Sequence, residues 1–432
     1  THRLSSAASD VYKRQEASSE EMKSLAFAID KAGEGTLEIV SDWLDKEIEM
    51  SWMREYVEKS DCGLTVLQTS GDAVKTILFC EEQFLKGKNV RPQFPGRNVG
   101  MMFGLESSLH PFIGHPSYRE IADLPLSERV KIMKDPAFKE KLLNEKPNFA
   151  SEIEKSMNEQ GNTKSQEEIK EAANLGLKLI SNYDTQFILG DPPNYEPGKE
   201  DSIAALAKSK GIAELEVIYD EFLKNEGTNL VYACFTPYDN HKLDFVERAY
   251  SLKSSVAGGS DGGAHCGLIC DASMPTTNLS HWARDREAGK KIPIELIVRK
   301  QTKDTAETYG LFDRGEIKTG MLADLNIIDF EKLNVTHPKM VYDLPLGGRR
   351  LIQTSSGYLA TVKSGEVVYE AGEATGVLPG KLIRGKQTCE VKTEKERVPF
   401  IDRTFRLMSV KALKLLWNYR KSPFKTTVVS DD

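Results

Sequence analysis

Hydrophobic and polar positions follow two alternating periods in the first part of the chain. Short apolar runs at 36–42, 63–70 and 89–94 are typical of buried strands, and the segments between them, near 46–59 and 72–86, have apolar residues at helical spacing. The runs begin about 27 residues apart, which suits one strand–helix unit. Repeated units of this kind predict an α/β fold with a parallel sheet.

This alternation stops between residues 105 and 229 and then resumes. The interrupting region contains short charged helical patterns, and the prolines of 190–202 exclude a regular element there. We interpret 105–229 as a large helical insertion over one face of the sheet. Long insertions of this kind are usually functional. An apolar run at 228–235, a helical pattern at 241–251 and a last strand at 254–261 follow.

The C-terminal part of the pattern changes from helices to strands. Helical patterns near 277–287 and 293–309 come first. Alternating runs then predict strands in 316–385, with a hairpin at Ser-Gly-Glu, residues 364–366.

These patterns divide the chain into four segments. Residues 1–16 have neither a helical nor a strand period, and we interpret them as an artefactual or disordered leader. We expect a partial barrel in 17–315 and a small β-sandwich in 316–385. The extension 386–432 is charged and contains a predicted helix.

The composition limits the classes of function. The 432 residues carry a formal net charge of -7, which argues against a nucleic-acid-binding surface and against attraction to anionic membranes. No apolar run approaches the ~20 residues of a membrane helix. Six cysteines without paired Cys-x-x-Cys motifs favour the reducing cytoplasm as the location.

A glycine-rich string, GGSDGGAHCGLICDA at 258–272, contains the end of the last predicted strand. Asp261 stands at the carboxyl end of that strand, where parallel sheets collect their chemistry. The glycines leave room for a ligand beside the acid. Asp261 is therefore a candidate general base or metal ligand, with the capping of a loop as the alternative.

Further strings carry a family resemblance. They are LHPFIGHPSYREIADLPLSERV at 109–130, TTNLSHWARDRE at 276–287, GLFDRGEIKTGMLADLNIIDF at 310–330 and TVKSGEVVYEAGEATGVLPGKLIRG at 361–385. Together they resemble the amidohydrolase superfamily and, within it, the N-acyl-D-amino-acid deacylase branch. The resemblance extends over residues 18–385 and is strongest in 254–385.

The resemblance implies a (β/α)8 barrel with a zinc centre that makes hydroxide available for attack on an amide. An aspartate at the end of the last barrel strand then takes a proton from the water and passes it to the leaving amine, and Asp261 matches that position. The family's H-x-H pair has no match here, and Gln68 and the segment Pro92, Gln93, Phe94 occur where relatives place histidines. We carry over Asp261 alone, and the other metal ligands stay unknown.

These departures predict an incomplete (β/α)8 barrel. With five convincing strands in place of eight, we expect an N-terminally truncated fragment of a D-aminoacylase-like protein. A one-metal variant or a divergent ligand set is the alternative reason for the changed strand ends. Open barrel edges are templates for aggregation, so we expect the fragment to be inactive and poorly soluble.

Other polar residues are candidates for contact with substrate. His265 lies four residues after Asp261, where it can contact substrate or orient the acid, and a plain loop hydrogen bond is the alternative. Arg284 and Arg286 can bind the carboxylate of an N-acyl amino acid as a bidentate fork, or pair with neighbouring acids on a helix surface. Structural roles are favoured for His110, His115, His281 and the Cys266–Cys270 pair.

We therefore predict a metal-dependent hydrolase of linear amides that is similar to N-acyl-D-amino-acid deacylases. A cyclic amidase of the hydantoinase or dihydroorotase type is the alternative with the same fold, and a non-catalytic fragment is the alternative of another class. The expected partner is a small acylated amino acid or a related amide, with zinc as the cofactor, and neither nucleic acid nor a membrane is expected. The oligomeric state and the stereochemistry of the substrate stay open.

Overall fold

The structure is a computed structural model that describes residues 18–41, 46–68, 74–149, 166–260, 262–263 and 265–388. Asp261, the predicted leader and the helix predicted near the C-terminus lie outside these residues. The chain divides into two compact units, one of Thr1–Gln301 with Asn334–Thr354 and one of Thr302–Leu333 with Ser355–Asp432. The predicted division into a barrel and a sandwich near residue 315 stays a prediction.

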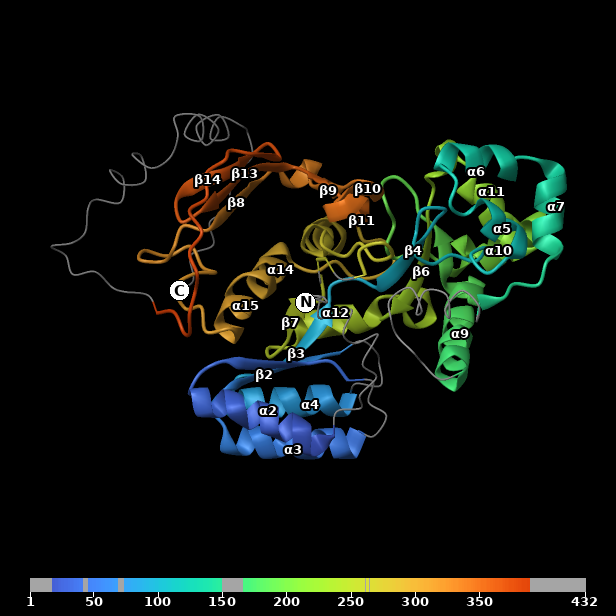
Figure 1. Cartoon of the computed structure of the whole chain (residues 1–432). Coiled ribbons are helices and arrows are strands. Elements are labelled where there is room, and N and C mark those ends of the chain that lie inside the picture. Colours follow the sequence, from blue (N-terminus) through green and yellow to red (C-terminus); the bar gives the residue numbers. More distant parts are fainter. Residues whose placement is uncertain are drawn as a thin grey trace. The chain divides into compact units, whose positions relative to one another are not determined.

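A parallel sheet forms the first part of the first unit. Its strands are β1 (Thr36–Ile39), β2 (Gly63–Leu67), β3 (Val90–Pro95) and β7 (Val256–Gly258), in the order β1-β2-β3-β7. The helices α3 (Lys46–Lys59) and α4 (Val74–Leu85) lie between the strands as the sequence predicts, and α2 (Ser19–Ala32) precedes β1. Figure 1 shows these helices together on one side of β2 and β3. The predicted α/β class with a parallel sheet is confirmed.

Burial of apolar side chains holds this layer together. Trp52 and Tyr56 of α3 pack with Leu64 and Val66 of β2 in one buried cluster. Each of these side chains is at most 1% exposed. Transfer of a large apolar side chain from water contributes roughly 1.5–3 kcal/mol, so the helix–sheet contact stabilises the layer strongly.

The prediction that the run at 228–235 continues the parallel sheet was wrong. The 228–235 run forms β6 (Val231–Thr236), which pairs antiparallel with β4 (Val99–Phe103) and with β5 (Gln186–Ile188). The sheet order is β4-β6-β5, separate from the parallel sheet. A short run of apolar residues does not alternate with polar ones, so its pattern shows neither which strand it pairs with nor whether the pairing is parallel or antiparallel.

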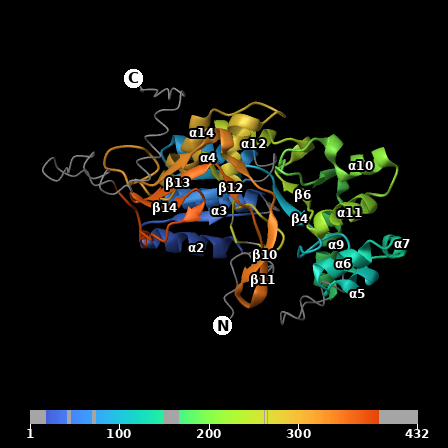
Figure 2. The ribbon, with the colours of Figure 1, turned by 90° about the horizontal axis from the view of Figure 1, so that it is seen from above.

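The region 105–229 is mainly helical, as predicted. Its helices are α5 (Pro116–Ile121), α6 (Leu126–Met133), α7 (Pro136–Asn144), α9 (Gln166–Ser181), α10 (Ile203–Lys210) and α11 (Glu214–Phe222). Figure 2 shows them gathered on the side of β4 and β6. Phe103 of β4, Phe112 and Phe222 share one buried cluster there. That this region is an insertion into a barrel stays a prediction.

Short elements complete the first unit. Short 3-10 turns lie between the longer elements, namely η2 (Tyr183–Thr185), η3 (Lys199–Asp201), η4 (Asn225–Gly227), η5 (Asp239–His241) and η8 (Pro345–Gly347). The segment 190–202 is otherwise irregular, as its prolines predict. The remaining elements are α12 (Asp244–Ser251), α13 (Met274–Thr277), the π-helix η6 (Asn278–Asp285), α14 (Ile294–Gln301), β9 (Asn334–Val335) and the antiparallel pair β10 (Lys339–Leu344) and β11 (Gly348–Ile352).

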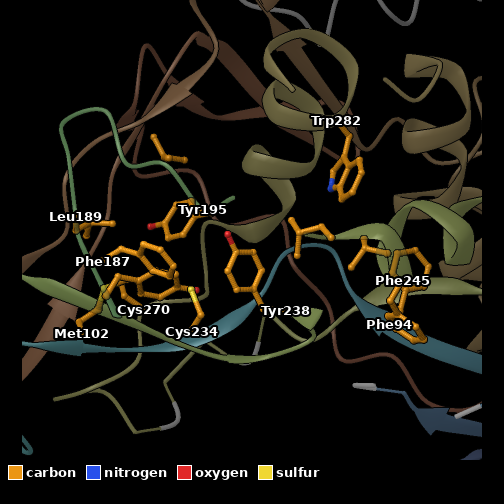
Figure 3. Packing of buried hydrophobic residues seen from close by; sticks show 14 of the residues in the cluster. Phe94, Met102, Phe187, Leu189, Tyr195, Cys234, Tyr238, Phe245, Cys270 and Trp282 are labelled. Atoms are coloured by element: carbon orange, nitrogen blue, oxygen red, sulfur yellow. The ribbon is translucent and has the colours of Figure 1, made fainter. Parts of the chain in front are cut away.

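A second apolar cluster joins these elements to the strands. Figure 3 shows Phe94 beside Phe245, and Tyr195 reaching into the cluster near Phe187 and Cys270. Trp282 of η6 is buried in the same cluster. Its indole Nε1 donates a hydrogen bond of 2.6 Å to the carbonyl of Gly96 just after β3. The π-helix is thereby fixed against the carboxyl end of the parallel sheet.

The second unit contains α15 (Lys303–Thr308), η7 (Phe330–Lys332), β12 (Ser355–Ser356) and an antiparallel sheet. The sheet has the order β15-β14-β13-β8, from β8 (Leu325–Ile328), β13 (Tyr358–Lys363), β14 (Glu366–Glu370) and β15 (Glu373–Ala374). The predicted hairpin is confirmed, because Ser364 and Gly365 have φ of 54° and 86° and connect β13 to β14. The pairing of this sheet with a second layer in a sandwich stays a prediction. No helix in the described parts of either unit has both the length and the apolar character to cross a membrane.

Candidate functional site

The carboxyl ends of β3 and β7 lie side by side in the parallel sheet. Pro95 at the end of β3 pairs with Gly258 at the end of β7. A Cβ at Gly258 would lie 2.6 Å from the Gln93 side chain, so a larger residue there would have to displace that glutamine. Asp261 follows Gly258 by three residues and lies outside the described residues, so its catalytic role stays a prediction.

The described residues at these strand ends do not form a zinc centre. Gln68 follows β2 and Gln93 lies in β3, and both side chains are buried. Zinc sites in proteins use cysteine, histidine and carboxylate ligands rather than amides. Among the residues that the structure describes, no three His, Cys, Asp or Glu side chains are grouped so that they could hold a metal ion. The metal ligands therefore remain unassigned.

Arg97 lies two residues beyond β3, at the same edge of the sheet, and the sequence reasoning missed it. Its side chain is fully buried. The Nη2 atom donates to the Cys270 carbonyl at 2.9 Å and to Asp271 Oδ1 at 3.2 Å. The guanidinium carbon lies 3.5 Å from the centre of the Tyr195 ring. Among the residues that the structure describes, Nε and Nη1 have no hydrogen-bond partner.

The neighbours of Arg97 are themselves fixed. The Tyr195 hydroxyl and the Gln353 side-chain amide exchange hydrogen bonds of 3.2 and 2.9 Å. Ser273 donates to the same amide oxygen of Gln353. Burial lowers the pKa of Arg97, but Tyr195 and Asp271 outweigh this effect and the pKa is raised, so the side chain is a cation at every ordinary pH. We call Arg97, Tyr195 and Asp271 the Arg97 cluster.

A second buried arginine, Arg286, directly follows η6. The Nε and Nη2 atoms of Arg286 donate to the two carboxylate oxygens of Glu196 at 2.9 and 3.0 Å. The Nη1 atom donates to Glu247 and, at 2.9 Å, to the Lys290 carbonyl. The guanidinium carbon lies 4.4 Å from the Trp282 ring centre. All three nitrogens of Arg286 therefore have protein acceptors.

Glu196 connects this arginine to a pocket of about 730 Å³. His281 Nε2 lies 2.9 Å from Glu196 Oε2, and both residues line the pocket. The backbone N–H of Leu243 donates to Glu196 Oε1 at 3.0 Å. Burial raises the pKa of Glu196, but the bonds from His281, Arg286 and Leu243 outweigh it and lower the pKa to about 2. We call Arg286, Glu196, Glu247 and His281 the Arg286 cluster.

The other predicted substrate contacts occupy different surroundings. Arg284 donates to both carboxylate oxygens of Asp285, at 2.6 and 2.8 Å. His265 is exposed, with a φ of 46°, and its carbonyl accepts hydrogen bonds from the backbone N–H groups of Leu268 and Ile269. The roles predicted for Arg284, Arg286 and His265 stay predictions, and the structure brings Arg286 together with acids from distant segments rather than with its sequence neighbours.

His110 of the helical region is buried among aromatic rings. His110 Nδ1 accepts a hydrogen bond of 3.2 Å from the backbone N–H of Phe112. The His110 ring packs edge-on against Tyr118, with centroids 4.8 Å apart. Burial lowers the pKa of His110 to about 3, with smaller contributions from charges such as Arg129. This neutral, packed histidine matches the structural role that the sequence favoured.

Comparison with known proteins gives one family match. Residues 184–369 match the amidohydrolase family. No curated protein is similar enough to match the chain.

Solved structures of D-aminoacylase show a weak likeness to the chain. One, described for its binuclear metal centre, has 15% identity and a TM-score of 0.42. A second, a mutant in a complex with copper chloride, has 14% identity and a TM-score of 0.42. Each likeness covers 83% of this chain, which spans 58% of the length of those proteins. At this TM-score the likeness places no residue of the site.

Proposed function

We propose that this chain, whose residues 184–369 match the amidohydrolase family, hydrolyses a linear amide bond in an N-acylated amino acid. The observation that carries the proposal is that the matched residues include β7, whose carboxyl end lies at the edge of a parallel sheet. Asp261 follows β7 by three residues in the sequence. Ligands of parallel α/β proteins bind at this edge. The motifs at 109–130 and 276–287 favour linear over cyclic amides, through their resemblance to N-acyl-D-amino-acid deacylases.

Asp261 is the residue to which we assign proton transfer. Its carboxylate accepts a proton from the water that attacks the amide carbonyl, and the protonated acid then gives this proton to the departing amine. The amide and one water are converted into a carboxylic acid and an amine, with no other reactant. A carboxylate suits both stages, because it accepts a proton near neutral pH and donates it once protonated. The zinc that the family resemblance implies has no assigned ligands here, so its presence is part of the test.

The test compares the full-length chain with an Asp261→Asn variant. We expect release of free amine from N-acetyl-D-methionine, and a rate at least about 100-fold lower in the variant, because general acid–base catalysis contributes roughly 10²–10⁴-fold. The control is Asp61→Asn, since the Asp61 side chain is fully exposed at the surface. Equal rates for Asp261→Asn and the wild type would overturn the assignment.

Two further measurements separate the alternatives. Hydrolysis of hydantoin or dihydroorotate in place of the linear amide would replace the proposal with a cyclic amidase. Elemental analysis of the purified chain and loss of activity with a chelator would establish the metal requirement. A chain without activity on either class of amide, with or without added zinc, would be a non-catalytic fragment.

A further inference from the structure

We propose that the pocket of about 730 Å³ lined by Glu196 and His281 binds a small molecule through a neutral secondary amide group. His281 accepts a hydrogen bond from the N–H of this amide, and Asn194 donates one to its carbonyl. The inference goes beyond the proposed function, because it concerns binding alone and needs no chemistry at Asp261. The described residues that line the pocket include none from the strand end at 254–272.

The first argument is the fixed tautomer of His281. Its Nε2 lies 2.9 Å from Glu196 Oε2, and Arg286 and the backbone N–H of Leu243 also donate to that carboxylate. With a pKa lowered to about 2, Glu196 is ionised and can only accept hydrogen bonds. The His281 Nε2 therefore carries the proton, and Nδ1 of the neutral ring is an acceptor.

The His281 ring is also fixed in place and open to a ligand. It packs edge-on against Trp282, with ring centroids 5.3 Å apart and an interplanar angle of 84°. Trp282 is fully buried and donates to the Gly96 carbonyl. The His281 side chain is 17% exposed, whereas that of Glu196 is 1% exposed. A ligand in the pocket can therefore reach the imidazole but not the carboxylate behind it.

The second argument is a donor held by the same glutamate. The backbone N–H of Glu196 donates to Asn194 Oδ1 at 2.9 Å. Because an N–H needs an oxygen as its partner, this bond also fixes which end of the Asn194 amide carries the nitrogen. Asn194 lines the pocket. Within the described part of the chain, neither Asn194 Nδ2 nor His281 Nδ1 has a hydrogen-bond partner.

The third argument is the match between these two groups and an amide. A trans secondary amide is planar and presents its N–H and its C=O on opposite sides. The pocket presents an acceptor at His281 and a donor at Asn194, which are bonded to the two ends of Glu196, its carboxylate and its backbone nitrogen. An ester of the same shape offers the carbonyl but no N–H, so it can make only one of the two bonds.

The fourth argument is charge. Arg286 compensates the Glu196 carboxylate, and Arg284 pairs with Asp285. Apart from histidines, the other charged residues of the lining are exposed and comprise two of each sign, namely Lys199, Lys242, Glu200 and Glu287. The lining thus favours neither an anion nor a cation. The remaining wall includes apolar residues such as Pro192, Pro193 and Val335, and the volume lies in the range of small-molecule sites.

A second histidine in the lining provides the matched control. His241 Nε2 lies 2.8 Å from the Asp184 carbonyl, so the Nδ1 of its neutral ring is an acceptor as well. No bond of His241 involves Glu196 or Asn194 among the described residues. Replacing His241 therefore removes an imidazole from the pocket but leaves the proposed pair of groups unchanged.

The experiment compares N-benzylacetamide with benzyl acetate, its ester of the same shape. Ligand-detected NMR titration of the full-length Asp261→Asn chain gives the two dissociation constants. We expect the amide to bind about fivefold more tightly than the ester, which is the usual net value of one hydrogen bond. Since this background lacks the acid to which we assign proton transfer, binding is measured whether or not the chain is an amidase.

Two variants separate the two hydrogen bonds. His281→Phe keeps an aromatic ring beside Trp282 but removes the acceptor, so it should weaken the amide about fivefold and the ester less than about twofold. Asn194→Asp keeps the oxygen that faces the Glu196 backbone but turns the donor into an acceptor. It should weaken both probes about fivefold or more and preserve the preference for the amide. His241→Phe should change either affinity less than about twofold.

Several results would overturn the inference. They are equal affinity for amide and ester in the background chain, binding of neither probe, or equal losses for both probes in His281→Phe. A loss of the amide preference in His241→Phe rather than in His281→Phe would also remove the role of His281. The comparison of the two probes needs no change in the pocket, so it decides the question even if His281→Phe does not fold.

A last measurement tests the class of ligand. Secondary amides occur in small N-acyl compounds and in peptide chains, and the inference names a small molecule. We expect N-benzylacetamide to bind at least as tightly as N-acetyl-trialanine amide. Binding of the blocked peptide about tenfold more tightly would overturn this class and identify the pocket as a site for extended backbone. Amidase activity that Asp261→Asn abolishes, without an amide preference in the pocket, would leave the proposed function standing alone.

Discussion

Two buried arginines in the first unit differ in how many of their N–H groups donate to protein acceptors. Both Arg97 and Arg286 are fully buried, and both guanidinium groups stack on an aromatic ring. Arg286 has a protein acceptor at every nitrogen, whereas Arg97 has acceptors at Nη2 alone within the described part of the chain. Equal burial therefore does not mean equal stabilisation, because each buried donor without a partner costs roughly 1–3 kcal/mol.

The largest effect is expected when the Arg286 cluster loses its main acceptor. Glu196→Gln removes the buried charge that pairs with Arg286 and leaves that cation with two more exposed acids, Glu247 and Asp244. Breaking a buried ion pair from one side costs about 3–5 kcal/mol when no other partner remains, so the remaining acids keep the loss at the lower end, about 3 kcal/mol. We expect the free energy of unfolding, measured by urea denaturation, to fall by this amount.

The control for this prediction is Glu200→Gln. Glu200 lines the same pocket but is exposed, and surface changes of this kind usually stay within about 0.5 kcal/mol. A similar loss for Glu196→Gln and Glu200→Gln would show that the Arg286 cluster does not stabilise the fold, and the contrast with Arg97 would lose its meaning.

The same cluster should make the stability depend on acid pH. The pKa of Glu196 is lowered from 4.5 to about 2 in the folded chain. A lowered pKa contributes stability that is fully present above the unfolded value and is lost as the pH falls from about 4.5 toward 2. We therefore expect the stability difference between wild type and Glu196→Gln to shrink across this window. Thermal unfolding from pH 6 to pH 2.5 measures it, and a constant difference would contradict the assignment of the lowered pKa to Glu196.

Replacing each arginine by lysine compares the two clusters directly. Lysine keeps the charge but loses the planar fork. Arg286→Lys should lower the free energy of unfolding by about 2 kcal/mol or more, because several bonds to Glu196 and Glu247 are lost. Arg97→Lys should cost about 1 kcal/mol or less, because an ammonium group can still reach Asp271 and the donors without partners disappear. Equal losses would mean that Arg97 is as fully satisfied as Arg286, with water as the missing partner.

Much of the parallel layer could be predicted from the sequence. The helix predicted at 46–59 is α3, and the runs at 36–42, 63–70 and 89–94 contain β1, β2 and β3. These elements have strong local periods, and each pairs or packs with its neighbours in the chain. The run at 228–235 was assigned to the wrong sheet because β6 pairs with β4 and β5, and pairing with distant strands leaves no local signal.

The site was harder to predict for the same reason. Arg286 resembles a surface residue in the string WARDRE, but its acceptors Glu196 and Glu247 lie 90 and 39 residues away in the chain. Arg97 lies in an irregular stretch after β3 with no period at all, and its partner Asp271 is 174 residues distant. Residue types and spacing identified Asp261 as a candidate, whereas the satisfaction of donors can be judged only in three dimensions.

The smallest effect is expected at Arg284, which the sequence also proposed as a substrate contact. Its bonds to the adjacent Asp285 form an ion pair whose acid is about half exposed, and exposed pairs contribute about 0–1 kcal/mol. Arg284→Gln should therefore change the free energy of unfolding by less than about 1 kcal/mol. Urea denaturation checks this, with Arg350→Gln as the matched variant, because Arg350 pairs with Asp343 at the surface. A loss of about 2 kcal/mol or more at Arg284 alone would show that its bonds stabilise the fold as those of Arg286 do, and the contrast between an exposed and a buried ion pair on neighbouring arginines would fail.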